Sequence, residues 1–281
     1  MRSSPVPFAT LLTRTGAGLA LTFLLLGTGA GTALAQGGPA SLQEIQLTGS
    51  FGLDYSNGGY GTNQNTNVLL GLFGLGLETD SFRVTASMPY MRISGRGLVV
   101  FDAGGNAIVV NRRGSTASDV RTGFGDLNLS ASYTIPPAIL DDFEVRLTAS
   151  TKLPTASSRR RLSTGEADFG MNIDVSRQYG IWGPFLAVGY LIPGRPLAYT
   201  LSDTVSVSAG TSIELSSNLV AVTSYEYDSE STPLVAASHQ LFGSLSWVRD
   251  GGVTLTGYTK IGLNDGSPDV GGGLLVSFGF P

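Results

Sequence analysis

The sequence predicts an all-β fold, a transmembrane antiparallel up-and-down β-barrel of about 12 strands. Apolar and polar residues alternate with a period of two, so successive side chains face two different environments. The alternating segments span about 10 to 13 residues, which fits the roughly 9–11 residues of a membrane-spanning strand better than the roughly 5–6 of a soluble one. Charged residues make up only 14% of the chain, against about 25% in soluble domains, which indicates a surface that does not face water.

The first 35 residues have the pattern of a secretory signal peptide. Arg2 and Arg14 supply its positive region, and an apolar stretch and a small-residue run follow, ending at Ala35. The apolar stretch is shorter than the roughly 20 residues that a membrane helix needs. We therefore expect a cleaved signal peptide at 1–35 and an outer-membrane β-barrel at 36–281.

The alternation divides the exported part into twelve predicted strands. In one of the clearest, Phe143 and Val145 oppose Glu144 and Arg146. The facing of 182–193 is ambiguous, so the count of 12 holds within about two strands, an even number being typical of bacterial barrels. The predicted strands are Gln43–Tyr55, Asn67–Thr79, Phe82–Ile93, Thr122–Thr134, Asp142–Pro154, Ala167–Gln178, Trp182–Pro193, Thr204–Ser216, Leu219–Ser229, Ala236–Val248, Val253–Asn264 and Val270–Pro281.

The connections between these strands alternate between long and short. The long ones are 56–66, 94–121, 155–166 and 194–203, followed at the same end by the shorter 230–235 and 265–269, and the others are tight turns. Because periplasmic turns are short and extracellular loops are long in this class, the N-terminus is predicted on the periplasmic side. Within 94–121, two apolar runs, 98–101 and 107–110, predict a hairpin that extends the third and fourth strands above the membrane.

Strand direction and alternation together place several charges on the lumen side. Lys152 ends an upward strand, whereas Asp126 and Asp168 begin the downward strands on either side of it. Because neighbouring strands lie about 4.8 Å apart, these three side chains are predicted to form a cluster at the outer mouth, with Arg146 and Asp174 paired nearer the periplasm. Two interpretations remain open: the charges neutralise one another in a narrow barrel, or they line and gate a permeation path.

The sequence offers little for catalysis or cofactor binding. Its single histidine, His239, is followed at the second position by Leu241, whereas outer-membrane phospholipases carry a serine there. There is no cysteine, and the turn-like run 264–269 lacks the spacing of a calcium loop. We therefore predict no enzyme activity, no cofactor and no bound metal.

The charge balance and the two chain ends bear on partners. Without its two signal-peptide arginines the chain keeps 15 of its 17 basic residues against 21 acidic ones, a net charge near −6, and no basic patch predicts nucleic-acid binding. Arg159–Arg161, in an outer loop, would contact anionic lipopolysaccharide or remain solvated, and both readings stay open. The last strand, Val270–Pro281, alternates up to Phe280, as in the strand that the outer-membrane assembly machinery reads.

Three short motifs carry a family resemblance that covers most of the exported chain. They are Gly123-Phe124-Gly125-Asp126, Lys152-Leu153-Pro154-Thr155 and Ser163-Thr164-Gly165 followed by Asp168. At this spacing they resemble the outer-membrane transporters associated with the meta-cleavage pathway of phenol degradation. Ala156 stands where that family has a glycine, and the 94–121 insertion is long.

The resemblance implies passive uptake of small aromatic or apolar compounds. We therefore expect a passive channel in the bacterial outer membrane, with membrane lipid, lipopolysaccharide, the assembly machinery and a small-molecule solute as partners. The alternative is a non-conducting structural or adhesive barrel that acts through loop 94–121.

Overall fold

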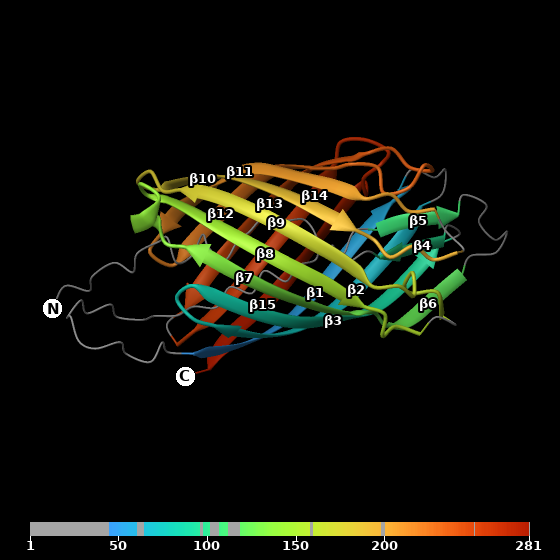
Figure 1. The fold of residues 1–281 in the computed structure, drawn as a ribbon, viewed down its shortest axis with the longest axis horizontal. Coiled ribbons are helices and arrows are strands. Elements are labelled where there is room, and N and C mark those ends of the chain that lie inside the picture. The colour runs from blue at the N-terminus through green and yellow to red at the C-terminus, as the bar shows by residue number, and fades with distance from the viewer. Residues whose placement is uncertain are drawn as a thin grey trace.

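Within the described part of the chain, twelve antiparallel strands close into a barrel (Figure 1). This computed structural model describes residues 45–60, 65–95, 98–101, 107–111, 119–157, 160–197, 200–249 and 251–280. The predicted signal peptide lies outside these ranges. No helix among the described residues is long and apolar enough to cross a membrane.

The strand bounds agree with the predicted alternation to within a few residues. The wall consists of β1 (Gln46–Gly58), β2 (Thr66–Glu78), β3 (Phe82–Gly95), β6 (Asp119–Phe124), β7 (Leu127–Ile135), β8 (Phe143–Leu153), β9 (Asp168–Arg177), β10 (Trp182–Ile192), β11 (Thr204–Ser216), β12 (Leu219–Asp228), β13 (Ser238–Arg249), β14 (Val253–Gly262) and β15 (Val270–Phe280). A short hairpin of β4 (Leu98–Phe101) and β5 (Ala107–Asn111) and a 3-10 turn, η1 (Pro137–Ile139), complete the elements.

One wall strand is interrupted. β6 and β7 both pair with β3, through Tyr90↔Phe124 and Ser87↔Asn128, and so make one crossing. The predicted strand Thr122–Thr134 is therefore one crossing broken at Gly125 and Asp126. The barrel closes because β1 pairs with β2 on one side and with β15 on the other.

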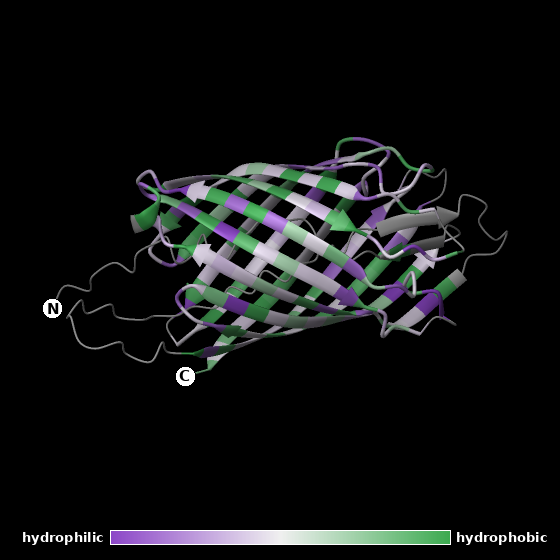
Figure 2. Cartoon of the chain, viewed as in Figure 1, coloured by the Kyte–Doolittle hydropathy of each residue, from purple (hydrophilic) through white to green (hydrophobic). Residues whose placement is uncertain are grey.

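Residues of opposite hydropathy alternate along the wall strands (Figure 2), and most of the exposed wall residues are apolar. The apolar residues that alternation assigned to the lipid side are exposed, for example Phe51 at 42% and Leu75 at 60%. Exposed aromatic residues gather toward the two strand ends, as in the girdles of membrane barrels. At the outer end they are Tyr55, Tyr90, Phe124, Phe169, Tyr190 and Tyr225, and at the opposite end Phe82, Tyr133, Phe143, Tyr179, Trp182, Trp247, Phe278 and Phe280.

The facing of β10 is now settled. Trp182, Leu186 and Tyr190 are exposed on the outer face, whereas Ala187 is buried on the inner one. Because Phe185 and Leu191 also lie on the inner face, this strand is apolar on both sides, and alternation alone could not orient it.

The connections sort by end as predicted. β1 begins and β15 ends at the left end of Figure 1, where Leu47 faces Phe280. The tight turns lie at that end, and the longer connections at the other. The predicted topology, with short turns on the side of the N-terminal strand, is confirmed.

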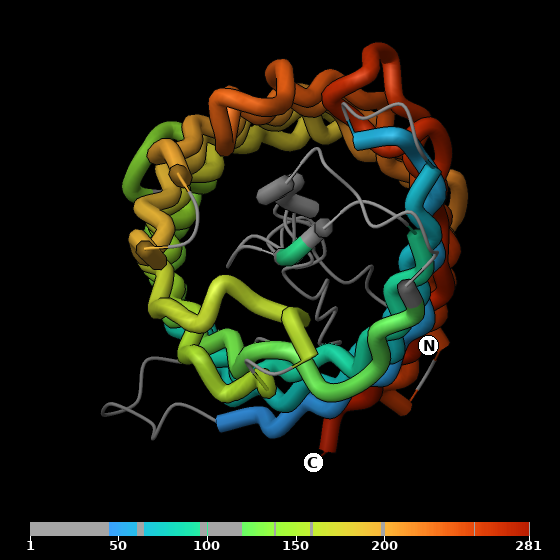
Figure 3. Tube along the Cα trace, turned by 90° about the vertical axis from the view of Figure 1, so that its right-hand side faces the viewer, coloured from blue at the N-terminus to red at the C-terminus, as the bar shows by residue number. Residues whose placement is uncertain are grey.

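The hairpin within the longest connection corrects one expectation. Val99 pairs with Val109 and Phe101 with Ala107, but the two strands form a separate sheet instead of extending the wall. The wall itself is extended by the pairing of β3 with β6. Seen along the barrel, the coloured part of the hairpin lies inside the outline of the wall (Figure 3), and Val100 is buried.

Candidate permeation path and mouth loop

The inner face of the barrel is mostly polar. Period-two alternation puts hydroxyls and carboxylates inside, as expected for a lumen that holds water. Buried inward polar residues of the wall include Thr48, Ser50, Asp54, Ser87, Ser208, Ser212, Ser224, Glu226, Gln240, Ser246, Thr254, Thr256 and Ser277. Some are joined, as in the Tyr258 hydroxyl that donates to Asp54 Oδ2 at 2.6 Å.

The structure brings Asp126, Lys152 and Asp168 together near the outer end of this lumen. Lys152 Nζ lies 2.8 Å from Asp168 Oδ2 and 3.6 Å from Asp126 Oδ2. Lys152 and Asp168 are direct cross-strand partners on β8 and β9, and Asp126 lies at the break that precedes β7. All three are buried, with exposures of 1%, 0% and 5% for Lys152, Asp168 and Asp126.

The same charges hold a loop, which we call the mouth loop (154–167, described except for 158–159). Asp126 accepts hydrogen bonds from the Ala156 amide, at 2.9 Å, and from the Ser163 hydroxyl. Lys152 Nζ donates to Thr164 Oγ1 at 3.1 Å. Because buried charges are stable only when paired and hydrogen-bonded, the cluster and the loop stabilise each other. Asp168 ties in the next connection through the Gly194 amide, at 2.9 Å.

Two arginines fasten the mouth loop to the wall. β8 ends at Leu153, so the outer edge of β6 faces the loop instead of a strand. Arg160 Nη1 donates to the Thr122 carbonyl of that edge at 2.8 Å, and Arg121 Nη1 donates to the Arg161 carbonyl at 2.6 Å. Arg160, which belongs to the loop's basic run, therefore supplies a hydrogen-bond donor to a backbone carbonyl of the wall. Arg159 lies outside the described residues.

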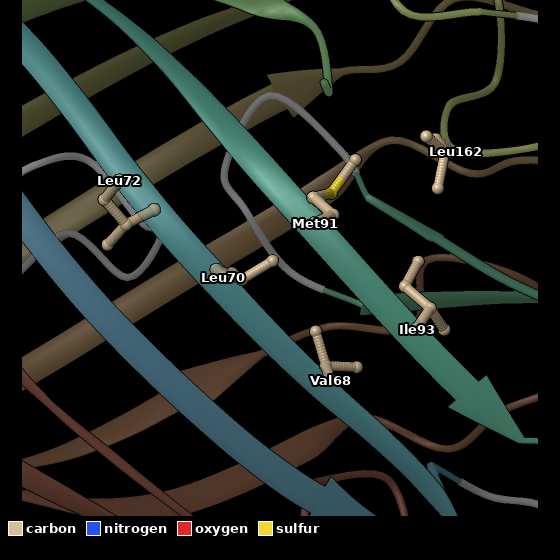
Figure 4. Close-up of a cluster of buried hydrophobic side chains, with 6 residues drawn as sticks. All are labelled: Val68, Leu70, Leu72, Met91, Ile93 and Leu162. Carbon is tan, nitrogen blue, oxygen red and sulfur yellow. The ribbon is translucent and has the colours of Figure 1, made fainter. Parts of the chain in front are cut away.

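Behind the mouth loop lies an apolar cluster that sequence reasoning did not find (Figure 4). It consists of Val68, Leu70 and Leu72 of β2, Met91 and Ile93 of β3, and Leu162 of the loop. We call the five strand residues the apolar patch. The sequence did contain a signal for this cluster. In the run Val68–Phe73 every residue except Gly71 is apolar, so both the inner and the outer face of β2 are apolar there.

Two glycines of the first resemblance motif allow these close contacts. A Cβ on Gly123 would lie 2.9 Å from Leu162 Cδ1, and one on Gly125 would lie 2.7 Å from Met91 Cε. Any side chain at either position would push against the loop or the apolar patch. Gly123 therefore allows the mouth loop to pack on the wall, and Gly125 allows the break in the wall strand to pack on β3.

The other two predicted site residues lie lower in the barrel. Arg146 and Asp174 are direct cross-strand partners on β8 and β9. The ion pair recorded for Arg146 is nevertheless with Glu144 of its own strand, at 3.4 Å, and Asp174 Oδ2 accepts from Asn172 Nδ2 at 2.8 Å. Both side chains belong to a second charged group toward the end where β1 begins, which also holds an ion pair between Arg83 and Glu78 at 2.5 Å.

Comparison with known proteins gives a likeness of fold. No family model and no curated protein matches the chain. It is similar to an outer membrane channel from Pseudomonas putida F1, with a TM-score of 0.65 and 13% identity over 87% of this chain and 100% of that one. It is less similar to the translocator domain of the autotransporter NalP from Neisseria meningitidis, with a TM-score of 0.49 and 11% identity over 86% and 90%.

Proposed function

We propose that the protein is a passive channel of the bacterial outer membrane for small compounds. The observation that carries this proposal is the closed barrel whose outer face is apolar and whose inner face is polar. A barrel of this strand number, with strands about 4.8 Å apart and tilted by about 40°, has a backbone diameter of about 24 Å. That width accommodates inward side chains and a small solute between them. The likeness to a solved outer membrane channel supports the proposal.

The solutes that we propose are small and carry an aromatic or apolar part. The apolar patch in the lumen supports this class, as does the resemblance of three motifs to transporters associated with phenol degradation. Within this function, Asp126, Lys152 and Asp168 position the mouth loop that narrows the entrance. Arg146 and Asp174 contribute charge to the lower lumen.

The remaining features of the proposal follow from an exported membrane barrel. We propose a signal peptide at 1–35, insertion in membrane lipid with lipopolysaccharide around the outer end, and recognition of β15 by the assembly machinery. We propose no enzymatic chemistry for this protein. Its single histidine, His239, lies at the outer rim, where its Nδ1 is 2.5 Å from the Tyr225 hydroxyl.

Purified protein in planar bilayers tests the channel directly. We expect discrete conductance steps, and slower growth of a deletion strain on low concentrations of an aromatic carbon source. Absence of conductance, together with unchanged uptake in the deletion strain, would exclude this function.

The second candidate is a structural or adhesive barrel that acts through loop 94–121. It is favoured by the separate hairpin of β4 and β5 at the outer end (Figure 1). Replacing 98–111 by a short glycine-serine linker distinguishes the two. A channel changes its conductance, whereas an adhesive barrel loses binding to cells or surfaces and keeps its permeability.

A further inference from the structure

The apolar patch is not required by the membrane, because its side chains face away from lipid. Val68 is the cross-strand partner of Ile93, and Leu70 that of Met91, so four of its members form a square on two adjacent strands. Leu72 continues the row on β2. Apolar surface facing a wet lumen is unfavourable unless something apolar covers it.

The mouth loop places the buried side chain of Leu162 on the patch (Figure 4), and its partly buried Ala156 packs against the same cluster. Leu162 is the only large aliphatic residue of that loop and is only 1% exposed. Ser163 and Thr164, the next two residues, fix the backbone through Asp126 and Lys152. Rotation of the Leu162 side chain would therefore expose the part of the patch that it contacts without opening the loop.

The size and chemistry of the patch fit a flat ring. Inward positions on one strand are about 6.8 Å apart and the strands about 4.8 Å, so the square is comparable to the face of one aromatic ring. Met91 adds a polarisable thioether, which packs favourably against aromatic rings. A sheet surface is also flatter than the groove that an extended alkyl chain would need.

A hydrogen-bond acceptor lies just below the patch. The next inward residues of β3 toward the periplasm are Pro89 and then Ser87, and the cross-strand partner of Ser87 is Asn128. Asn128 Oδ1 is buried and has no hydrogen-bond partner among the described residues. A buried acceptor without a partner favours a ligand that brings a donor.

We propose that the apolar patch is a binding site for neutral solutes that join an apolar ring to hydroxyl groups. The ring takes the place of the Leu162 side chain, and a hydroxyl donates to Asn128 Oδ1. The proposal rests on the proposed channel function only in that the solute arrives through the lumen.

Two water-soluble probes that differ in one group test the site: phenyl β-D-glucoside and methyl β-D-glucoside. Their affinities for the purified, folded full chain in detergent are measured by titration calorimetry. Because burial of a ring contributes substantially to affinity, we expect about tenfold or greater preference for the phenyl compound.

Three variants then assign the preference to the patch. Leu70→Ser should lower the affinity for phenyl β-D-glucoside by about fivefold or more, since it removes apolar contact. Leu162→Ser should raise it, because no side chain must be displaced. The matched control Val222→Ser makes the same kind of change on the inner face of β12, five strands from β2, and should leave the affinity unchanged.

Circular dichroism and heat-dependent gel mobility establish that each variant is folded. If Leu70→Ser misfolds, the test depends on Leu162→Ser, whose affinity for phenyl β-D-glucoside is expected to rise. That change lies in a loop and does not alter the wall. Equal affinity for both glucosides, or a fall in affinity in Leu162→Ser, would overturn the proposal. Conductance of the same preparations is read separately: binding without conductance would refute the channel, and conductance without ring preference would refute the site.

Discussion

Substitution of Lys152 by methionine tests the role of the buried cluster. The change keeps the length and apolar stem of the side chain but leaves Asp126 and Asp168 as buried carboxylates without their cation. Removing one partner of a buried ion pair typically costs about 3–5 kcal/mol. Because both carboxylates keep hydrogen bonds from backbone amides, at Ala156 and Gly194, we expect the lower end, about 3 kcal/mol.

Guanidinium unfolding in detergent, followed by the fluorescence of Trp182 and Trp247, measures this loss. The control combines Lys152→Met with Asp126→Asn and Asp168→Asn, which removes every charge of the cluster. Since the neutral triple variant leaves no buried charge unpaired, we expect it to recover at least half of the lost stability. A loss below about 1 kcal/mol for Lys152→Met alone would refute the reasoning.

The same variant has a local readout at the mouth loop. Loss of the Lys152 contact with Thr164 weakens the attachment of the loop, which carries the trypsin-sensitive residues Arg160 and Arg161. Trypsin should therefore cleave there faster in Lys152→Met than in the unaltered protein, as mass spectrometry of the fragments would show. Unchanged cleavage would mean that the loop does not depend on the cluster.

Other parts of the barrel give checks of different kinds. Gly123→Val places side-chain atoms against Leu162 and should cost about 1–3 kcal/mol in guanidinium unfolding while increasing the single-channel conductance. Leu274→Arg puts a charge on the lipid face in the middle of β15 and should cost about 2–4 kcal/mol, whereas Ser244→Arg on the lumen face should cost less than half of that. Tyr258→Phe removes a hydroxyl that donates to a carboxylate at 2.6 Å, and its unfolding free energy should fall by about 1.5–3 kcal/mol.

Much of the wall could be predicted from the sequence because lipid and lumen impose opposite polarity on alternate residues. That rule orients β1 and β8 and gives the strand count and the sorting of the connections. The sorting of the connections gives the direction of each strand, and direction and alternation together predict the proximity of Lys152 to Asp126 and Asp168.

The same rule fails where a face is apolar for another reason. On β2 and β10 both faces are apolar, so alternation cannot reveal the apolar patch or orient β10. Contacts made by loops could not be predicted from alternation either. The hydrogen bonds from Ser163 and Ala156 to Asp126 depend on how the mouth loop folds inward. For Arg146, cross-strand register was right, but Glu144, two residues away on the same face, forms its ion pair.

The seam between β1 and β15 also determines how the chain must fold. Its pairs, such as Leu47 with Phe280, join the two ends of the barrel sequence, whereas other wall neighbours follow one another along the chain. Because closing so long a loop loses much entropy before any contact forms, seam closure is expected to be the slow, late step of folding. Until then β1 and β15 are open edges that can pair with other chains. The half-folded molecule is thus the aggregation-prone species, and the seam is where a folding catalyst would act.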